Sequence, residues 1–412
     1  MFINIIYIFA FYLFIMSPYF IFGGVSIHGG MLGLFVLSLV LIFKQGKISV
    51  PRPIVNYSFV LLLISSYIAF MSVFINGKLA SASVSYFINI VFYIFLGAFF
   101  YCANSNKYDL ESQINTIINF LIISVVFNGI VILLEFQFPS FRSAVESILQ
   151  SNNSNIDYLE RSNRFRGLAS GGAANLSLLY GFTLVALYYQ FLLNKIRIYT
   201  FIFSFSVAFF SCLLIGRTGL VVAGAGIFVI SIVSFFDRHL SSYKSIVFIA
   251  LMFFILPVLP IFLSQFMTNY MLDYALMFFY RGLDGIKNEG TVDVLSAMTT
   301  YPNSFIDALF GVGTDSGGFF THTRSDSGYL KMFTTMGYPL AIMLYISIGL
   351  IFIRHAQGII KYRWLLLTFV GAWFFSEIKE PFVFKGYTAR LLWFLLAMLI
   401  VDRYFKAKLI RK

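Results

Sequence analysis

Long apolar segments dominate this chain and restrict it to folds with nonpolar surroundings. About 12 segments approach the ~20 residues that a helix needs to cross a bilayer. Short turns that contain Gly, Ser, Lys or Arg separate most of them. The sequence therefore predicts an all-α integral membrane protein with about 12 transmembrane helices. The predicted spans are residues 2–20, 28–43, 54–74, 82–101, 114–135, 175–193, 197–215, 219–236, 245–263, 328–353, 363–377 and 389–401.

Composition agrees with this class and excludes others. Of 412 residues, 59% are hydrophobic and 11% are charged, whereas soluble domains carry about 25% charged residues. The net charge of +12 does not indicate a nucleic-acid partner, because the basic residues lie in short loops between spans. The two cysteines form no disulfide or metal-binding pattern. We expect no nucleic acid, no metal and no cofactor.

The loops between spans differ in charge, and this predicts their sidedness. Short loops rich in Lys and Arg face the cytoplasm. Both termini are then cytoplasmic, and two long loops, at about 136–174 and 264–327, lie outside the cytoplasm. We find no internal repeat and no soluble domain, so residues 1–412 are expected to form a single polytopic domain. The basic residues on the cytoplasmic side are Lys44, Lys47, Arg52, Lys107, Lys195, Arg197, Arg238, Lys244, Arg354, Lys361, Arg363, Arg403, Lys406, Lys408, Arg411 and Lys412.

Arginines gather at the end of the first long loop. Arg161, Arg164 and Arg166 precede a run of small residues, 168–174, at the expected start of a helix. Guanidinium groups bind phosphate in a two-pronged way, and helix N-termini favour anions. This pattern predicts a phosphate-binding site. The alternative is a basic loop that contacts lipid headgroups.

Two further arginines occupy the outer side. Arg217 lies in Gly216-Arg-Thr-Gly219, which joins two apolar segments almost without a loop. An arginine at this depth costs a few kcal/mol unless it is paired or reaches the headgroups. Arg281 follows an apolar aromatic segment, 270–280, that we expect to lie at the interface. Each is a candidate ligand for an anionic lipid head, and each could instead be an ordinary charge at a helix end.

The stretch from Gly311 to Leu330 is polar and runs directly into an apolar segment. It contains His322, Arg324 and Asp326, and the aspartate stands at the mouth of the next span. A carboxylate beside an Arg and a His could act as a general base on a sugar hydroxyl. A solvated loop histidine is the alternative for His322. On the same face, the turn that holds Glu377, Lys379, Glu380 and Lys385 has mixed charges, which can pair with one another.

The order of these motifs resembles the O-antigen polymerase (Wzy) family, within the wider polymerase and ligase superfamily of bacterial inner membranes. Arg-Phe-Arg-Gly at 164–167 precedes a span, and Gly-Arg-Thr-Gly at 216–219 joins two spans. Leu-Phe-Gly-Val-Gly at 309–313 and Asp-Ser-Gly-Tyr-Leu at 326–330 follow, with Gly337 entering the next span. The resemblance covers about residues 161–337, and elsewhere it rests on hydropathy alone.

This resemblance implies an all-helical glycosyltransferase of the GT-C type in the bacterial inner membrane. Such an enzyme moves a glycan from one undecaprenyl diphosphate carrier to the non-reducing end of a second carrier-linked unit, on the periplasmic side. Arg217 would act on the diphosphate during catalysis, and Asp326 would be the base. Arg164, Arg166, Arg281, His322 and Arg324 would bind substrate. A chain-length regulator protein and membrane lipid are the other implied partners.

Two alternatives stay open. O-antigen ligases have a histidine where this chain has Asp326, which favours a polymerase, although His322 is only four residues earlier. A lipid-linked oligosaccharide flippase or another secondary transporter would also have about 12 spans. A transporter of that kind commonly shows two related halves and charges at mid-membrane, and we see neither. The polymerase hypothesis makes one spatial prediction, that a single outer cavity is lined by Arg166, Arg217, Arg281 and Asp326.

Overall fold

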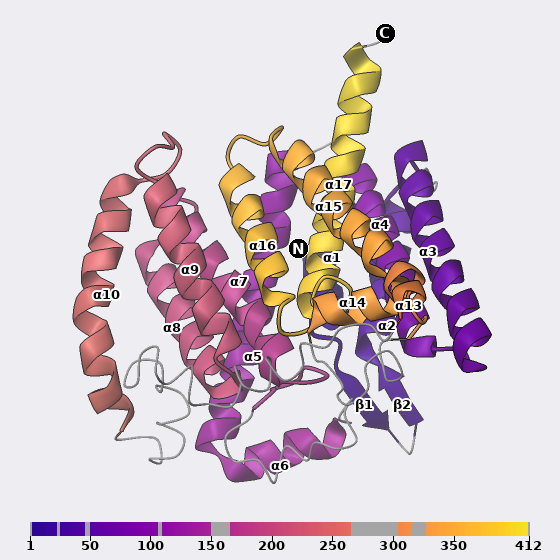
Figure 1. The fold of residues 1–412 in the computed structure, drawn as a ribbon. Coiled ribbons are helices and arrows are strands. Elements are labelled where there is room, and N and C mark those ends of the chain that lie inside the picture. Colours follow the sequence, from indigo (N-terminus) through magenta and orange to yellow (C-terminus); the bar gives the residue numbers. More distant parts are fainter. Residues whose placement is uncertain are drawn as a thin grey trace. The chain divides into compact units, whose positions relative to one another are not determined.

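The computed structural model describes residues 2–22, 25–45, 50–105, 109–149, 165–264, 304–314 and 327–410. Within these ranges the chain forms 15 helices and one two-stranded antiparallel hairpin (Figure 1). Apolar residues recur along whole helices rather than on one face, which is typical of helices surrounded by lipid or by other helices. The prediction of a helical membrane protein is confirmed at this level.

Six helices are long and apolar enough to cross a membrane, and we conclude that the chain is a multi-pass membrane protein. Further apolar helices in the described ranges are shorter, so about 12 crossings remains an expectation. The six are α3 (Arg52–Asn76), α4 (Ser81–Asn104), α5 (Leu110–Gln137), α7 (Ala173–Leu192), α8 (Ile198–Ile215) and α15 (Tyr338–Ala356). The shorter ones include α1 (Phe2–Met16), α2 (Gly29–Gln45), α9 (Thr218–Val233) and α16 (Arg363–Ser376). Of α10 (Ser242–Leu263), the segment Ser242–Ile255 belongs to this shorter group.

Two predicted segments differ from the structure. The predicted span 328–353 is interrupted, because α14 (Gly328–Met336) ends at Gly337 before α15 begins. Gly337 has a φ of 80°, a conformation that L-residues rarely adopt, and Pro339 follows within the first turn of α15. Hydropathy does not detect such a break, since both helices are apolar.

The turn between the first two predicted spans is a β-hairpin. Strands β1 (Tyr19–Phe22) and β2 (Val25–His28) pair antiparallel, with Tyr19 opposite His28. The sequence held the signal, because β-branched and aromatic residues flank a Gly-Gly pair.

Short helices also occur inside the long predicted loops. Helix α6 (Pro139–Ile148) lies in the first loop and α13 (Phe305–Phe310) in the second. Within its own part of the molecule, α6 runs across the direction of α8 and α9 (Figure 1). The expected interfacial segment 270–280 lies outside the described residues.

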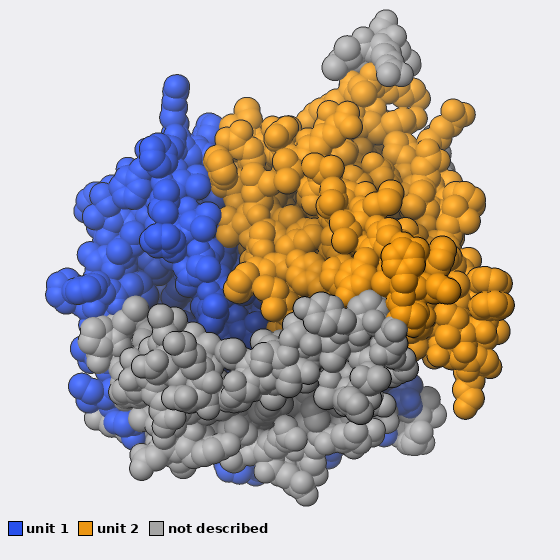
Figure 2. Space-filling view, in the orientation of Figure 1, with its two compact units in different colours: residues 1–37, 115–286 blue, residues 38–114, 287–412 orange. Residues whose placement is uncertain are grey.

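The chain divides into two compact units, each made of two separate sequence segments (Figure 2). Unit 1 comprises residues 1–37 and 115–286, and its core is α7, which is almost completely buried. Helix α9 approaches α7 so closely that a Cβ added to Gly219 would stand 1.8 Å from the Ser177 carbonyl oxygen. Only glycine permits this contact, which places the 216–219 turn against α7.

Unit 2 comprises residues 38–114 and 287–412. Its last helix, α17 (Tyr387–Ile410), packs along α4, and the Tyr101 hydroxyl donates a 2.9 Å hydrogen bond to Asp402 between them. Trp373 of α16 is fully buried and stands edge-on to Trp393 of α17. The expectation that residues 1–412 form a single polytopic domain stays a prediction.

Candidate functional site

The structure describes two of the predicted site residues, Arg166 and Arg217, and both belong to unit 1. The prediction that one cavity joins arginines to an aspartate therefore remains a prediction. The remaining predicted site residues, which lie outside the described residues, are Arg164, Arg281, His322, Arg324 and Asp326.

Arg166 is almost fully buried, with 1% of its surface exposed. Its guanidinium faces Glu146 of α6 with two parallel hydrogen bonds, one of 3.1 Å from Nε to Oε1 and one from Nη2 to Oε2. Nη1 and Nη2 also point to the carbonyls of Ser170 and Leu149. A two-pronged Arg–carboxylate contact is among the stronger pairings in proteins. In this structure Arg166 holds α6 through Glu146 against the segment that precedes α7. Its role in binding the diphosphate stays a prediction.

Sequence reasoning missed Glu146 because it treated this region as a loop. The signals for α6 are Pro139 at its first position and apolar residues Phe141, Val145 and Ile148 at helical spacing. Helix α6 is too short for a span, so a search for apolar runs passes over it.

A second carboxylate, Glu135, lies near the end of α5 with 2% of its surface exposed. Its Oε2 accepts a 3.2 Å hydrogen bond from the Gly167 amide, while Oε1 has no hydrogen-bond partner among the described residues. Asn128, also on α5, donates to the Arg166 carbonyl and accepts from the Leu168 amide at 2.8 Å. Helix α5 thus fixes the backbone of residues 166–168 just before α7 begins.

The turn that carries Arg217 is held by a single hydroxyl from α7. Ser177 Oγ donates to the Gly216 carbonyl and accepts a 2.7 Å hydrogen bond from the Gly219 amide. Arg217 is the N-cap of α9, and its side chain is partly exposed. The positive end of the α9 dipole adds to the attraction of this position for an anion. The arrangement presents a guanidinium at the end of an apolar bundle with its backbone immobilised.

In unit 2, Glu377 is a buried acid at the C-cap of α16, with 0% of its surface exposed. Its Oε1 accepts a 2.6 Å hydrogen bond from the Tyr345 hydroxyl, and Oε2 accepts one of 2.8 Å from the Val383 amide. Burial raises the pKa of Glu377 to about 8, although these hydrogen bonds oppose the shift. The expected pairing among charges of this turn is therefore wrong for Glu377, which points inward to a tyrosine.

The backbone carbonyl of the same residue anchors the start of α14. The Gly328 amide donates a 2.8 Å hydrogen bond to the Glu377 carbonyl, and a Cβ on Gly328 would stand 2.5 Å from Glu377 Oε1. The Tyr329 hydroxyl donates to the Phe374 carbonyl at 2.8 Å. Burial and the nearby Glu377 raise the pKa of Tyr329 to about 12, so it remains protonated at neutral pH. The segment that directly follows the predicted aspartate is thus tied to α16.

Searches with this chain find no matching protein family, no matching curated protein and no matching solved structure. Among the described residues, no group of three or more His, Cys, Asp or Glu side chains is arranged to hold a metal ion. The functional argument therefore rests on the sequence motifs and on the geometry of these two units.

Proposed function

We propose that this chain polymerises lipid-linked polysaccharide repeat units at the outer side of a bacterial inner membrane. The observation that carries the proposal is the partly exposed Arg217, fixed at the end of an almost uncharged bundle by Ser177, Gly216 and Gly219. A membrane enzyme whose leaving group is a lipid diphosphate needs a positioned cation at that depth. The motif order described above supplies the substrate class.

The distribution of charge within the long helices supports an enzyme with its chemistry at the membrane boundary. In the six span-length helices of the described structure, every Asp, Glu, Lys or Arg lies in the first or last turn. Ion-coupled transporters usually bind near the bilayer midplane. The transporter alternative lacks such a charge within these helices, and the polymerase hypothesis does not need one.

The proposed reaction replaces one carbon–oxygen bond with another. A hydroxyl of the acceptor sugar attacks the anomeric carbon of the donor glycan, and the bond from that carbon to the diphosphate oxygen breaks. The acceptor proton passes to Asp326, and undecaprenyl diphosphate leaves with the bonding electron pair. Arg217 stabilises the charge that develops on the leaving oxygen. Around it, Arg164, Arg166 and Arg281 hold the diphosphate, while His322 and Arg324 contact the acceptor.

For Arg166 this role requires an exchange of partners. The guanidinium would have to leave Glu146 and reach a phosphate, so its contribution to affinity is reduced by the cost of breaking a buried ion pair. Arg217 stands in a turn that is held by Ser177, and its side chain is partly exposed, whereas that of Arg166 is buried. On this difference in exposure we rank Arg217 first among the arginines.

Deletion of the gene, followed by a gel of the surface polysaccharide, tests the reaction class. Loss of a polymerase leaves lipid A core that carries a single repeat unit. Polymer that accumulates on the carrier without ligation would instead identify a ligase. Complete absence of surface repeats would identify a flippase, and either outcome overturns the proposal.

Substitution of Arg217 tests the site. We expect Arg217→Ala to lower polymerisation by about 10²-fold or more, the usual effect of removing one preorganised donor at a developing anion. Arg217→Lys should recover part of the activity, because lysine keeps the positive charge but cannot donate two parallel hydrogen bonds as the guanidinium does. Arg238→Ala, an exposed arginine beyond the other end of α9, is the matched control. A wild-type chain-length ladder in Arg217→Ala, at normal expression, would remove the assignment.

The proposed mechanism uses arginines rather than a metal. Purified protein should therefore keep full activity in EDTA. A strict requirement for added magnesium or manganese would contradict this part of the mechanism.

A further inference from the structure

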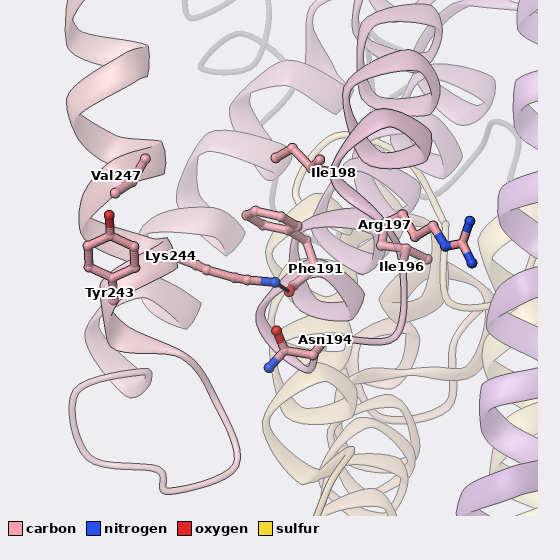
Figure 3. Close-up of a pocket in the computed structure, with 8 residues that line it drawn as sticks. All are labelled: Phe191, Asn194, Ile196, Arg197, Ile198, Tyr243, Lys244 and Val247. Carbon is pink, nitrogen blue, oxygen red and sulfur yellow. Dashed lines mark hydrogen bonds between the residues drawn. The ribbon is translucent and has the colours of Figure 1, made fainter.

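A cavity of about 350 Å³ lies in unit 1 between the end of α7, the start of α8 and the start of α10 (Figure 3). Its walls combine two basic side chains with apolar ones, among them Phe191, Ile198 and Val247. The basic loops at this end place it on the predicted cytoplasmic side. It belongs to none of the sites described above.

Lys244 crosses the cavity from α10 toward α7. Its Nζ donates a 3.0 Å hydrogen bond to the Phe191 carbonyl and stands 4.2 Å from the centre of the Phe191 ring. It forms no ion pair with an acidic residue in the described ranges. An ammonium group has three donors, and the carbonyl takes one. Lys244 can therefore present its remaining donors to an anion in the cavity.

Arg197 supplies a second cation at the N-cap of α8. Its side chain is exposed, has no carboxylate partner among the described residues, and in Figure 3 its guanidinium points away from Lys244. The long side chain has enough rotatable bonds to turn toward an anion that enters beside Lys244. Two cations with no described counter-ion, next to one cavity, favour a phosphate group.

The surroundings of the cavity are apolar and exposed. Ile198 is 47% exposed and Tyr243 is 74% exposed, and Val247 continues this surface along α10. In a membrane protein such a surface contacts acyl chains, and tyrosines and long basic side chains collect at the headgroup level. A free phosphate would use the cations but none of this apolar surface. A phospholipid uses both.

We propose that this cavity binds the headgroup of an anionic phospholipid, with its phosphate at Lys244 and Arg197 and its acyl chains over Ile198 and Val247. Basic pockets at the cytoplasmic ends of transmembrane helices bind such headgroups. The inference does not depend on the proposed polymerase activity. It would hold for any function of this chain.

Native mass spectrometry of the purified protein, titrated with phosphatidylglycerol or phosphatidylcholine, measures the binding. We expect Lys244→Gln and Arg197→Gln each to weaken phosphatidylglycerol binding about fivefold, the effect of one basic residue near an anionic surface. Lys244→Arg should bind like the wild type. The matched control is Lys195→Gln, which removes an exposed charge two residues from Arg197 but outside the cavity wall, and it should bind within about twofold of the wild type.

Three outcomes would overturn the inference. Equal weakening in Lys195→Gln would show diffuse attraction rather than a site. Equal binding of phosphatidylcholine would show that charge is not recognised. Displacement of the lipid by excess inorganic phosphate would assign the cavity to a free anion. Thermal unfolding of each variant checks folding, and Arg197→Gln alters only an exposed side chain, so it remains informative if Lys244→Gln is unstable.

Discussion

Unit 1 and unit 2 each bury an ionisable side chain that links a chain segment to the end of a helix, but they stabilise it differently. In unit 1, Arg166 meets the carboxylate of Glu146 directly. In unit 2, Glu377 is held by a tyrosine hydroxyl and backbone amides, and it forms no ion pair among the described residues. Lys331 influences it only through its charge from a distance.

Removing an ionised group from water costs free energy, and the two units compensate for this cost in different ways. A direct counter-ion keeps both groups ionised and makes each depend strongly on the other. Burial favours the neutral form of an acid, and hydrogen-bond donors without a counter-ion offset this only in part, so the stability of the second contact depends on pH. The contact of Arg166 should therefore be lost when Glu146 is removed. The contact of Glu377 should weaken when the pH rises.

Glu146→Gln should have the largest effect on stability. It removes the carboxylate that faces the buried Arg166, and breaking a buried ion pair typically costs about 3–5 kcal/mol. The measurement is thermal or denaturant unfolding of the purified protein in detergent. The double variant Glu146→Leu with Arg166→Met removes both charges and should recover most of the loss. A loss below about 1 kcal/mol in the single variant would show that the pair is more hydrated than its burial indicates.

Raising the pH should destabilise the protein through Glu377. Its pKa is about 8 in the folded state and 4.5 in the unfolded state, so between these values the folded chain holds a proton that the unfolded chain has released. Stability then falls with pH across this window, by ~1.4 kcal/mol per unit at most, or about 2 kcal/mol from pH 6 to pH 8. Glu377→Gln, which cannot ionise, should flatten the profile, and an unchanged profile would contradict the assignment.

Tyr345→Phe should have a smaller effect, about 1–2 kcal/mol, because it leaves Glu377 Oε1 without its donor. The hydroxyl stabilises the carboxylate, so its loss should also move the fall in stability to higher pH. Tyr57→Phe, on a partly exposed tyrosine of α3, is the matched control. If both variants behave alike, the Tyr345 hydrogen bond does not support Glu377.

The smallest effect is expected at the exposed pair of Glu111 and Lys361, whose charged atoms are 3.7 Å apart. Glu111→Gln should change the free energy of unfolding by less than about 1 kcal/mol, since solvent screens such pairs. The same substitution chemistry in Glu146→Gln then isolates the contribution of burial. A loss at Glu111 comparable to that at Glu146 would remove the distinction between the two kinds of pair.

Hydropathy predicts where most helices lie, because a long apolar run can be identified from the local sequence without knowledge of its tertiary contacts. The predicted spans 82–101 and 197–215 correspond closely to α4 and α8. Helix α6 and the break at Gly337 escape the method, since one is too short and the other leaves hydropathy unchanged. The carboxylate partner of Arg166 is hidden for another reason. Glu146 is 20 residues earlier, and only the fold of α6 brings it there.

Only those parts of the candidate site whose residues are adjacent in the sequence could be predicted. Gly216-Arg-Thr-Gly219 marks a tight junction between two apolar segments, and the structure finds that junction at the start of α9. Ser177, which holds it, resembles any other serine in an apolar helix. Glu377 is hidden in a turn of mixed charge, because sequence alone does not tell an inward-facing carboxylate from a solvated one.

The break at Gly337 has a consequence for topology. With a rise of about 1.5 Å per residue, the nine residues of α14 extend only ~14 Å, less than half of the ~30 Å hydrocarbon thickness. Helix α14 therefore cannot cross alone, whereas the 19 residues of α15 reach about 28 Å. Splitting one predicted span into two helices leaves the parity of crossings unchanged, and the sidedness of every later segment with it.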